Sequence, residues 1–555
     1  VARNELNSIN DIGVLDRARY TVCGFYSGPS VSYLVHRILE GNHLGSMANS
    51  SGGRWCSRGM VAVVLFFLLC RIPIVMREVG GQDEEWFAIP GWTILQDGVP
   101  RVPYAPHRVE DSAFYKVDKA LLALPPLFYY LSAPLFAILP PTYSTARLVS
   151  MAAGVFTLIL VYLIARHPFK EPLVGLFAAG LFSLSRPFFF PATLARPDML
   201  CGMWGLAALW VMWRWLEHRR QRDLVLAGAF LGLGMLTHPF ALIYCIQVGV
   251  WVLVVDGSWR QRLARSTLLI ACSLAAFALW LPLIATFPDI FRMQFFSNVL
   301  DRSGPGLITR LLFPWPFVSG QAELLSEHAG LLQIVLMSGG LFLGTWFAWR
   351  AKDRPAQTLL LLTWSSIYLL VACQGSHPTK GYWCYPAALL FLCLGWVINR
   401  VGGLLWARST SSRIVAVVTA ALVLAALIPG SGVRTWWTYM RHRSNVNYDA
   451  TRFVDRILAD LPADARYTVD RAFVFNFHAS GRSTLLAMTE KFFFDVEPFP
   501  YDYLIVSRHC MDLDIRSVLK GRLIGTYGDR DDFFSCYVEV YVPVDSPVFK
   551  ISDRE

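Results

Sequence analysis

The stretch WCSRGMVAVVLFFLLCRIPIVMREVGGQDEEW, residues 55–86, decides the fold class. Its first part, 55–73, is an apolar block about as long as a helix that crosses the hydrocarbon core of a bilayer. Three consecutive carboxylates, Asp83, Glu84 and Glu85, follow a short distance after that block. This order predicts a membrane helix that ends near a compact acidic turn at one membrane face.

The composition of the whole chain agrees with a membrane protein. Of its 555 residues 55% are hydrophobic and only 16% are charged, and the mean hydropathy is +0.43. A soluble enzyme of this size cannot bury so much apolar surface, so that class is excluded. The net charge of +10 is spread over short loops and forms no basic stripe, so a nucleic-acid partner is not expected.

Similar apolar blocks recur along the chain, and we expect a polytopic α-helical membrane protein with about eleven transmembrane helices. The predicted spans are 55–73, 143–165, 172–190, 199–216, 223–237, 239–256, 266–287, 329–349, 356–373, 381–399 and 413–430.

The positive charges predict which side each loop faces. Arg54 and Arg58 precede the first span, which favours a cytoplasmic N-terminus. With that start, the later loops on the cytoplasmic side hold fifteen Arg and Lys residues, whereas the loops on the other side hold five. This asymmetry supports the predicted register because short cytoplasmic loops are rich in Arg and Lys.

One further apolar stretch, 121–139, does not fit as a span. Counting it as a span would invert every later loop and move the Arg-rich loops outside. We therefore expect it to lie along the outer membrane interface, with Tyr129 and Tyr130 as interfacial aromatic residues. The first outer loop then covers 74–142, and loops of that length are usually functional.

The remaining segments complete the domain organisation. Residues 1–54 are expected to be a cytoplasmic N-terminal segment, of which 1–46 differ from everything downstream, so that Met47 is an alternative native start. Residues 55–430 form the transmembrane domain. Residues 431–555 have an ordinary composition and predict a small extracytoplasmic α/β domain, with an amphipathic helix at 448–462 and strands at 466–478, 501–507 and 534–542.

Two acidic sites are predicted on the outer face. The first is the pair Asp83 and Glu84, for which a solvated acidic turn is the alternative interpretation. The second is Asp198 in LARPDML, which borders apolar helix and is costly there unless it is paired. Its alternative role is a salt bridge to Arg196 or Arg147.

Several cations and hydrogen-bonding groups are predicted on the same face. Each alone is explained by side chains that reach for lipid headgroups. Together they surround the two acidic sites, and this convergence favours a functional site built from Lys119, Arg147, Arg196, His238, Lys380 and Tyr382.

At this point the sequence resembles the GT-C superfold of polyprenyl-phosphate-dependent glycosyltransferases, and most closely the branch of protein mannosyltransferases and aminoarabinose lipid A transferases. The resemblance covers about residues 55–400. The features that carry it, in chain order, are Arg71 followed by Asp83-Glu84, Arg147 at the start of a span, ARPD at 195–198, GAFLGLGMLTHP at 228–239, and Lys380-Gly381-Tyr382 followed by Tyr385-Pro386.

The resemblance implies roles for individual residues. Asp83 would be the catalytic acidic residue, Glu84 its neighbour and Asp198 the second acidic site. The pocket for the donor phosphate would be formed by Lys119, Arg147, Arg196, His238, Lys380 and Tyr382. The sequence departs from the family at His238, where relatives often have Lys, and at Trp86, where some have a polar or basic residue.

The expected reaction needs only a base and positive charge near the donor phosphate. A sugar bound to a lipid phosphate carries its own leaving group, so cations that stabilise the growing phosphate charge matter more than a general acid. Asp83 would accept the proton of the attacking acceptor hydroxyl, which predicts single displacement with inversion. Asp83, Glu84 and Asp198 could share a divalent metal, but we favour no metal and no cofactor because Arg and Lys supply positive charge.

The expected protein is thus a glycosyltransferase of a bacterial inner membrane. It would move a hexose or pentose from a polyprenyl-phosphate donor, such as undecaprenyl phosphate, to an extracytoplasmic lipid, glycan or protein. A transporter or lipid flippase is the main alternative, although its charged sites would lie near the membrane midplane and its sequence would show paired repeats. A scaffold that displays residues 431–555 is a third interpretation.

Overall fold

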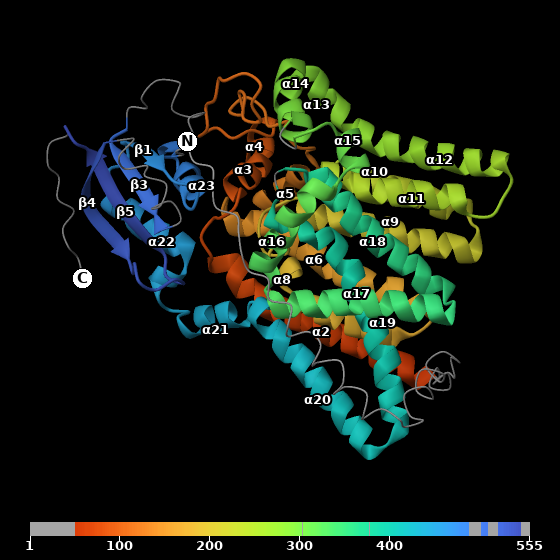
Figure 1. The fold of residues 1–555 in the computed structure, drawn as a ribbon. Coiled ribbons are helices and arrows are strands. Elements are labelled where there is room, and N and C mark those ends of the chain that lie inside the picture. Colours follow the sequence, from red (N-terminus) through yellow and green to blue (C-terminus); the bar gives the residue numbers. More distant parts are fainter. Residues whose placement is uncertain (1–49, 302–303, 377, 488–500, 509–519, 546–555) are drawn as a thin grey trace, which may run out of the picture.

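The computed structural model describes residues 50–301, 304–376, 378–487, 501–508 and 520–545. A bundle of helices makes up most of the molecule, and a β-sheet domain lies at one end of it beside α3 (Glu84–Phe87) and α4 (Ile89–Asp97) (Figure 1). The predicted segment 1–46, with its alternative start at Met47, lies outside the described residues.

Each apolar block predicted as a span contains a helix. These helices are α2 (Ser50–Arg77), α6 (Tyr143–Arg166), α7 (Pro172–Ser183), α9 (Asp198–His218), α10 (Gln221–Met235), α11 (Leu242–Val254), α12 (Trp259–Phe277), α17 (Leu331–Ala351), α18 (Arg354–Gln374), α19 (Cys384–Arg408) and α20 (Thr410–Leu427). Within the described residues, eight helical segments are long and apolar enough to cross a membrane. Because α7, the 15-residue helix α10 and the helix at Pro239–Val254 are shorter, the total of eleven spans stays a prediction.

Shorter elements connect these helices. They are α5 (Leu127–Phe136), α8 (Arg186–Phe189), η1 (Pro239–Ala241), η2 (Ala278–Trp280), α13 (Leu281–Thr286), α14 (Pro288–Phe296), η3 (Ser297–Asp301), α15 (Leu307–Leu312), η4 (Trp315–Phe317), α16 (Val318–Ala329), η5 (Lys380–Trp383), η6 (Ile428–Gly430), α21 (Val433–Arg441) and η7 (Val446–Tyr448).

The stretch 121–139 forms only the ten-residue helix α5, which contains Pro134. The sequence predicted both tyrosines of this stretch at the membrane interface, and for one of them the prediction is wrong. Tyr130 is exposed, whereas the Tyr129 ring is buried and stacks on Phe87 with 6.5 Å between ring centroids. Tyr129 is therefore a packing residue between α5 and α3, because its buried ring has no access to a membrane interface.

Glycines explain how closely two of the helices pack. A Cβ atom at Gly232 would lie 2.3 Å from the carbonyl oxygen of Ser273, and one at Gly228 would lie 2.7 Å from that of Leu269. Only glycine allows α10 to approach α12 at this distance. The Gly-rich stretch 228–239 thus serves helix packing.

The C-terminal region holds a five-stranded sheet in the order β2-β1-β3-β5-β4. Its elements are α22 (Ala450–Asp460), β1 (Arg466–Val469), α23 (Val474–Ala479), β2 (Ser483–Leu486), β3 (Tyr503–Ser507), β4 (Gly521–Gly528) and β5 (Tyr537–Pro543). β1 runs parallel to β2 and β3, whereas β5 is antiparallel to β3 and β4. The predicted strand 466–478 is too long, since the chain turns into α23 after β1.

The sheet domain is joined to the first outer loop by backbone and side-chain contacts. The Gly80 amide donates to the carbonyl of Ala472 at 3.0 Å, and the Leu486 amide donates to that of Tyr104 at 2.8 Å. The Tyr143 hydroxyl donates to the carbonyl of Arg471 at 2.7 Å. These contacts hold the loop that carries the three carboxylates against a folded domain.

Candidate active site

Asp83 is the exposed member of the acidic turn. It precedes α3 with a φ of 66°, in the left-handed region, and Gln82 before it also has a positive φ of 35°. Such a backbone is costly for residues other than glycine and is often found at functional sites. The Asp83 side chain is 51% exposed. Its Oδ2 accepts a hydrogen bond from Arg196 Nη1 at 2.5 Å, and its Oδ1 accepts none from the described residues.

Arg196 connects the two predicted acidic sites. Its Nε donates to Asp198 Oδ2 at 2.8 Å, while its Nη1 contacts Asp83. The Arg196 side chain is 3% exposed and that of Asp198 is fully buried. The Ser150 hydroxyl on α6 donates to the Arg196 carbonyl at 3.0 Å, which fixes the backbone before α9. One guanidinium group therefore joins the first outer loop to the start of α9.

Asp198 is the first residue of α9, where the helix dipole favours a negative charge. Its Oδ1 is buried and has no hydrogen-bond partner among the described residues. A buried carboxylate oxygen without a partner is costly to the folded state.

Two aromatic rings, called the aromatic wall below, lie near the Arg196 guanidinium. The rings of Phe87 and Tyr382 lie 5.8 and 5.9 Å from the guanidinium carbon. A Cβ atom at Gly381 would lie 3.6 Å from Asp198 Oδ2. The predicted motif at 380–382 therefore packs against the Arg196–Asp198 pair, at a distance that a Cβ atom would also tolerate.

Glu84 has a different environment from Asp83. Its carboxylate is fully buried and binds Arg147 through two hydrogen bonds, 2.8 Å from Nε to Oε1 and 2.5 Å from Nη2 to Oε2. The Ala195 and Gly81 amides donate to it as well, at 2.6 and 3.0 Å. Glu84 thus ties α3, α6 and the segment before α9 together.

Comparison with known proteins bears on the fold that carries these residues. Residues 123–285 match the family model of dolichyl-phosphate-mannose-protein mannosyltransferases. ArnT from Cupriavidus metallidurans bound to undecaprenyl phosphate has a TM-score of 0.56 at 17% identity, over 87% of this chain and 97% of that one. AglB from Archaeoglobus fulgidus, an archaeal oligosaccharyltransferase in complex with an inhibitory peptide and a dolichol-phosphate, has a TM-score of 0.54 at 14% identity, over 90% and 76%. No curated protein sequence matches the chain.

The chain has the GT-C fold. The resemblance predicted from the sequence is therefore confirmed, and the chain is an integral membrane protein. The segment that matches the family model carries Arg147, Arg196, Asp198 and His238, whereas Asp83 lies before it and Lys380 after it. This GT-C fold brings Asp83, Arg196, Asp198 and Tyr382 together from three separate parts of the sequence.

Arg147 does not fit the predicted role in a phosphate pocket. Its side chain is 1% exposed. Besides Glu84, its Nη1 donates to the carbonyls of Glu78 and Val75 at 2.7 and 3.3 Å, and its Nη2 donates to that of Val79 at 2.7 Å. All five N–H groups of the guanidinium are used, so none remains for a phosphate. Glu84 likewise has no free oxygen to offer an acceptor.

His238 lies beside the aromatic wall, with its ring centroid 5.5 Å from that of Tyr382. Its Nδ1 accepts a hydrogen bond from the Phe240 amide at 3.2 Å. Burial lowers the pKa of His238 to about 4, so the ring is neutral at neutral pH. The proton then sits on Nε2, and His238 can donate a hydrogen bond but adds no positive charge.

The two lysines of the predicted pocket are placed differently. Lys119 is 65% exposed, and its ion pair among the described residues is with Asp118 at 3.8 Å. Within the described residues, no ion pair or hydrogen bond joins Lys119 to Arg196 or Asp83. Lys380 begins η5, beside Gly381, but its side chain lies outside the part of the structure that is described.

Glu85 is a residue whose environment the sequence did not predict. It is 2% exposed, and its Oε2 has no hydrogen-bond partner among the described residues. Burial, together with the nearby Asp83 carboxylate, raises the pKa of Glu85 to about 8. The helical spacing of α3 was the available signal, because consecutive helix positions cannot all face solvent.

No group of three or more His, Cys, Asp or Glu side chains is arranged to hold a metal ion within the residues that the structure describes. Between Asp83 and Asp198 lies the Arg196 guanidinium, which already neutralises part of their charge.

Proposed function

We propose that this chain is a glycosyltransferase that moves a sugar from a polyprenyl-phosphate donor to a hydroxyl group of an extracytoplasmic acceptor. The single observation that carries the proposal is the position of the Asp83 carboxylate. Of the three consecutive carboxylates, it alone is largely exposed, on a left-handed turn, with one oxygen held by Arg196 and the other unoccupied. On a GT-C fold, this geometry suits a base that accepts a proton from a bound hydroxyl.

The proposed reaction is one displacement. The acceptor oxygen attacks C1 of the sugar and transfers its proton to Asp83 Oδ1, while the bond from C1 to the phosphate oxygen breaks and its electron pair stays on the phosphate. Because a single attack occurs from the side opposite the leaving group, the configuration at C1 inverts. A second nucleophile is not needed, and no cofactor takes part.

The leaving phosphate needs positive charge and hydrogen-bond donors. Arg196 Nη2 makes no hydrogen bond with the described residues, and both the His238 ring and the Arg196 guanidinium lie near the Tyr382 ring. We propose that these groups contact the donor, with Lys380 and Lys119 as further cations at its edge. A divalent metal is not favoured, because Arg196 occupies the space between the two carboxylates.

We propose a bacterial inner membrane as the location, with the N-terminus in the cytoplasm and the site and residues 431–555 outside. The distribution of Arg and Lys among the loops supports this orientation. Reporter fusions at about residue 435 should be active only outside the cytoplasm, and activity only in the cytoplasm would contradict both the orientation and the eleven-span topology.

The decisive experiment measures release of polyprenyl phosphate from a labelled lipid-linked sugar by the purified chain in detergent. The proposal expects release that depends on an acceptor hydroxyl, in equal amounts with and without a chelator. If the chelator abolished release of polyprenyl phosphate, the reaction would require a metal ion. A transporter or flippase would move the intact lipid-linked sugar and release no polyprenyl phosphate in any arm.

A further experiment asks which sugar the protein transfers and which acceptor it uses. Donors with a hexose and with a pentose should be offered in parallel, each with a lipid, a glycan and a peptide acceptor. Substitution of Lys119 and Lys380 by Gln should lower turnover by about tenfold to a thousandfold if they stabilise the departing phosphate. Unchanged turnover in the double variant would remove both lysines from the pocket.

A further inference from the structure

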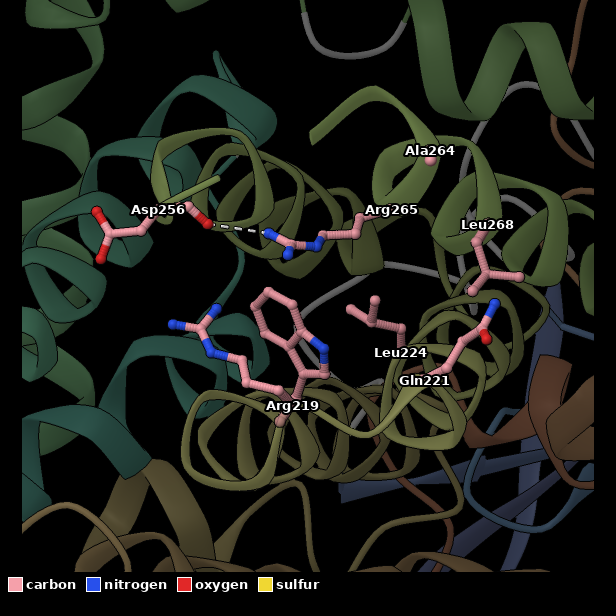
Figure 2. Close-up of a pocket in the computed structure, with 8 residues that line it drawn as sticks. Arg219, Gln221, Leu224, Asp256, Ala264, Arg265 and Leu268 are labelled. Atoms are coloured by element: carbon pink, nitrogen blue, oxygen red, sulfur yellow. Dashed lines mark hydrogen bonds between the residues drawn. The ribbon is translucent and has the colours of Figure 1, made fainter. Parts of the chain in front are cut away.

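A cavity of about 420 Å³ lies far from Asp83. Its lining residues come from the ends of α9 and α11 and the starts of α10 and α12, and they are Trp215, Arg219, Gln221, Leu224, Asp256, Ala264, Arg265 and Leu268 (Figure 2). α9 begins at Asp198 and ends at His218, so Trp215 lies about 25 Å along the helix from the candidate active site. The loop between α11 and α12 points away from the sheet domain (Figure 1).

Two arginines in this cavity share one aromatic ring. The guanidinium carbons of Arg219 and Arg265 lie 4.8 and 5.3 Å from the ring centroid of Trp215, which is 2% exposed. Arg219 caps α9 with a φ of 54°, so its backbone is fixed at the end of the helix. Arg265 lies two turns into α12. The buried indole thus holds two positive charges at the same cavity.

Neither charge is neutralised by a carboxylate among the described residues. Arg265 Nη1 donates to the backbone carbonyl of Asp256 at 3.1 Å, and Asp256 turns its carbonyl rather than its carboxylate toward Arg265 (Figure 2). The neighbouring carboxylate of Asp223 is buried and lies 3.7 Å from Arg214. The same helix ends and loops add Arg220, Arg222, Arg260 and Arg262, which together with Arg219 and Arg265 outnumber the nearby Glu217, Asp223 and Asp256. The cavity therefore favours an anion.

Apart from Gln221, the remaining wall of the cavity is apolar. Leu224 on α10 faces Ala264 and Leu268 on α12 across it. The apolar window of Trp259–Thr286 is only 17% buried inside the protein, so most of its surface is left for lipid. A ligand in this cavity would meet positive charge at the helix ends and apolar side chains toward the membrane.

We propose that this cavity binds the phosphate headgroup of an anionic membrane lipid. A guanidinium group matches a phosphate through two parallel N–H···O bonds, and two such groups on one side suit a single phosphate. Anionic lipids are attracted to basic segments of the kind found in these loops. The site lies on the face that the Arg-rich loops predict to be cytoplasmic, opposite Asp83, and it does not depend on the proposed transfer reaction.

The test compares two double variants of the full chain. Arg219→Gln with Arg265→Gln removes the charges of the cavity. Arg350→Gln with Arg354→Gln is the matched control, since Arg350 also lies over a tryptophan, 5.6 Å from Trp346, and the pair removes two charges from another loop of the same predicted side. Each protein is purified in detergent, and the phosphatidylglycerol that it retains is measured by native mass spectrometry over a titration.

The proposal expects the cavity variant to bind phosphatidylglycerol about tenfold more weakly, or worse, while the control binds like the wild type. Phosphatidylcholine should bind equally weakly to all three proteins. Equal loss in both variants would overturn the site, because it would reflect net charge alone. Displacement of the lipid by an equal concentration of inorganic phosphate would overturn the lipid assignment and identify a soluble phosphate as the ligand.

A second variant guards against misfolding. Arg219→Gly removes one of the two charges and suits the left-handed backbone at the end of α9, where glycine is the preferred residue. It should fold at least as well as the wild type in zwitterionic detergent and still lose most of the lipid retention. Full retention by this folded variant would contradict the proposal.

Discussion

Two guanidinium–carboxylate pairs lie side by side in this molecule, and they have opposite surroundings. Arg147 and Glu84 are both buried, and every polar atom of the Arg147 side chain is used by the protein itself. Arg196 and Asp83 form an equally short contact, but the Asp83 side chain is 51% exposed and keeps a free oxygen. Asp83 and Glu84 are consecutive residues, so the difference comes entirely from the directions in which the backbone turns them.

The contrast indicates that the Arg147–Glu84 pair stabilises the fold and that the Arg196–Asp83 pair serves the proposed reaction. A buried pair whose hydrogen bonds are all satisfied holds elements together, and losing one partner leaves an uncompensated charge. A pair with one exposed partner contributes less stability than a fully buried pair, but its exposed carboxylate can meet a substrate. The two pairs should therefore respond to the same kind of substitution in opposite ways, one in stability and one in turnover.

The largest expected effect belongs to Asp83→Asn. The variant keeps the size of the side chain and removes the basic oxygen, so turnover should fall by about 10²- to 10⁴-fold. Thermal stability and binding of the lipid donor should stay close to those of the wild type. The assay is release of polyprenyl phosphate. Asp97→Asn, which removes another exposed carboxylate paired with Arg101 on the same loop, is the control and should keep its activity.

The second prediction concerns Glu84→Gln, which leaves the Arg147 charge buried without its partner. The free energy of unfolding should fall by about 3–5 kcal/mol, the usual cost of breaking a buried pair. Thermal unfolding in detergent measures this loss. A variant as stable as the wild type would show that Glu84 is not part of the scaffold, and the contrast with Asp83 would then be wrong.

Asp198→Asn should have a smaller effect on turnover than Asp83→Asn. The carboxylate holds Arg196 through its Oδ2, so its replacement weakens one hydrogen bond to a charged group. Turnover should fall by roughly ten- to a hundredfold, which matches the about 1.5–3 kcal/mol of such a bond. A loss as large as that of Asp83→Asn would mean that the free Oδ1 of Asp198 contacts the substrate directly.

The smallest effect is expected for Glu85→Gln, and it depends on pH. The pKa of Glu85 is about 8 in the folded protein, against an ordinary value of 4.5, so the folded state holds a proton that the unfolded state releases. Folding stability contributed by this group is fully present below pH 4.5 and is lost as the pH rises toward about 8. Glu85→Gln should therefore match the wild type at pH 5 and be as stable or more stable at pH 8.

Unfolding midpoints at the two pH values measure this difference. A variant that is less stable than the wild type at pH 8 would show that the Glu85 carboxylate is charged and paired in the folded protein. Glu85 would then resemble Glu84, which is buried and paired, and only Asp83 would differ from its neighbours.

How much of this site the sequence predicted differs from residue to residue. Asp83, Arg196 and Asp198 were identified, and the structure brings them into one cluster. The alternative interpretation of Asp198, a salt bridge to Arg196, also describes a contact that is present. Arg147 was predicted to bind the donor phosphate, but its hydrogen bonds are all used inside the protein. The sequence does not show how many backbone carbonyl groups will surround an arginine at the start of a membrane helix. The different environments of Glu84 and Glu85 were not predicted either.

The sequence by itself determined the features that depend on composition and local order. Long apolar blocks require helices in a membrane, because backbone N–H and C=O groups cannot stay unpaired in hydrocarbon. Glycines at 228 and 232 and the motifs around Asp83, Asp198 and Tyr382 are local as well. Tertiary structure alone decided which carboxylate faces solvent, which arginine is saturated, and that Arg219 and Arg265 meet over Trp215. These properties arise from contacts between residues far apart in the chain, and burial and pKa follow from such contacts rather than from residue type.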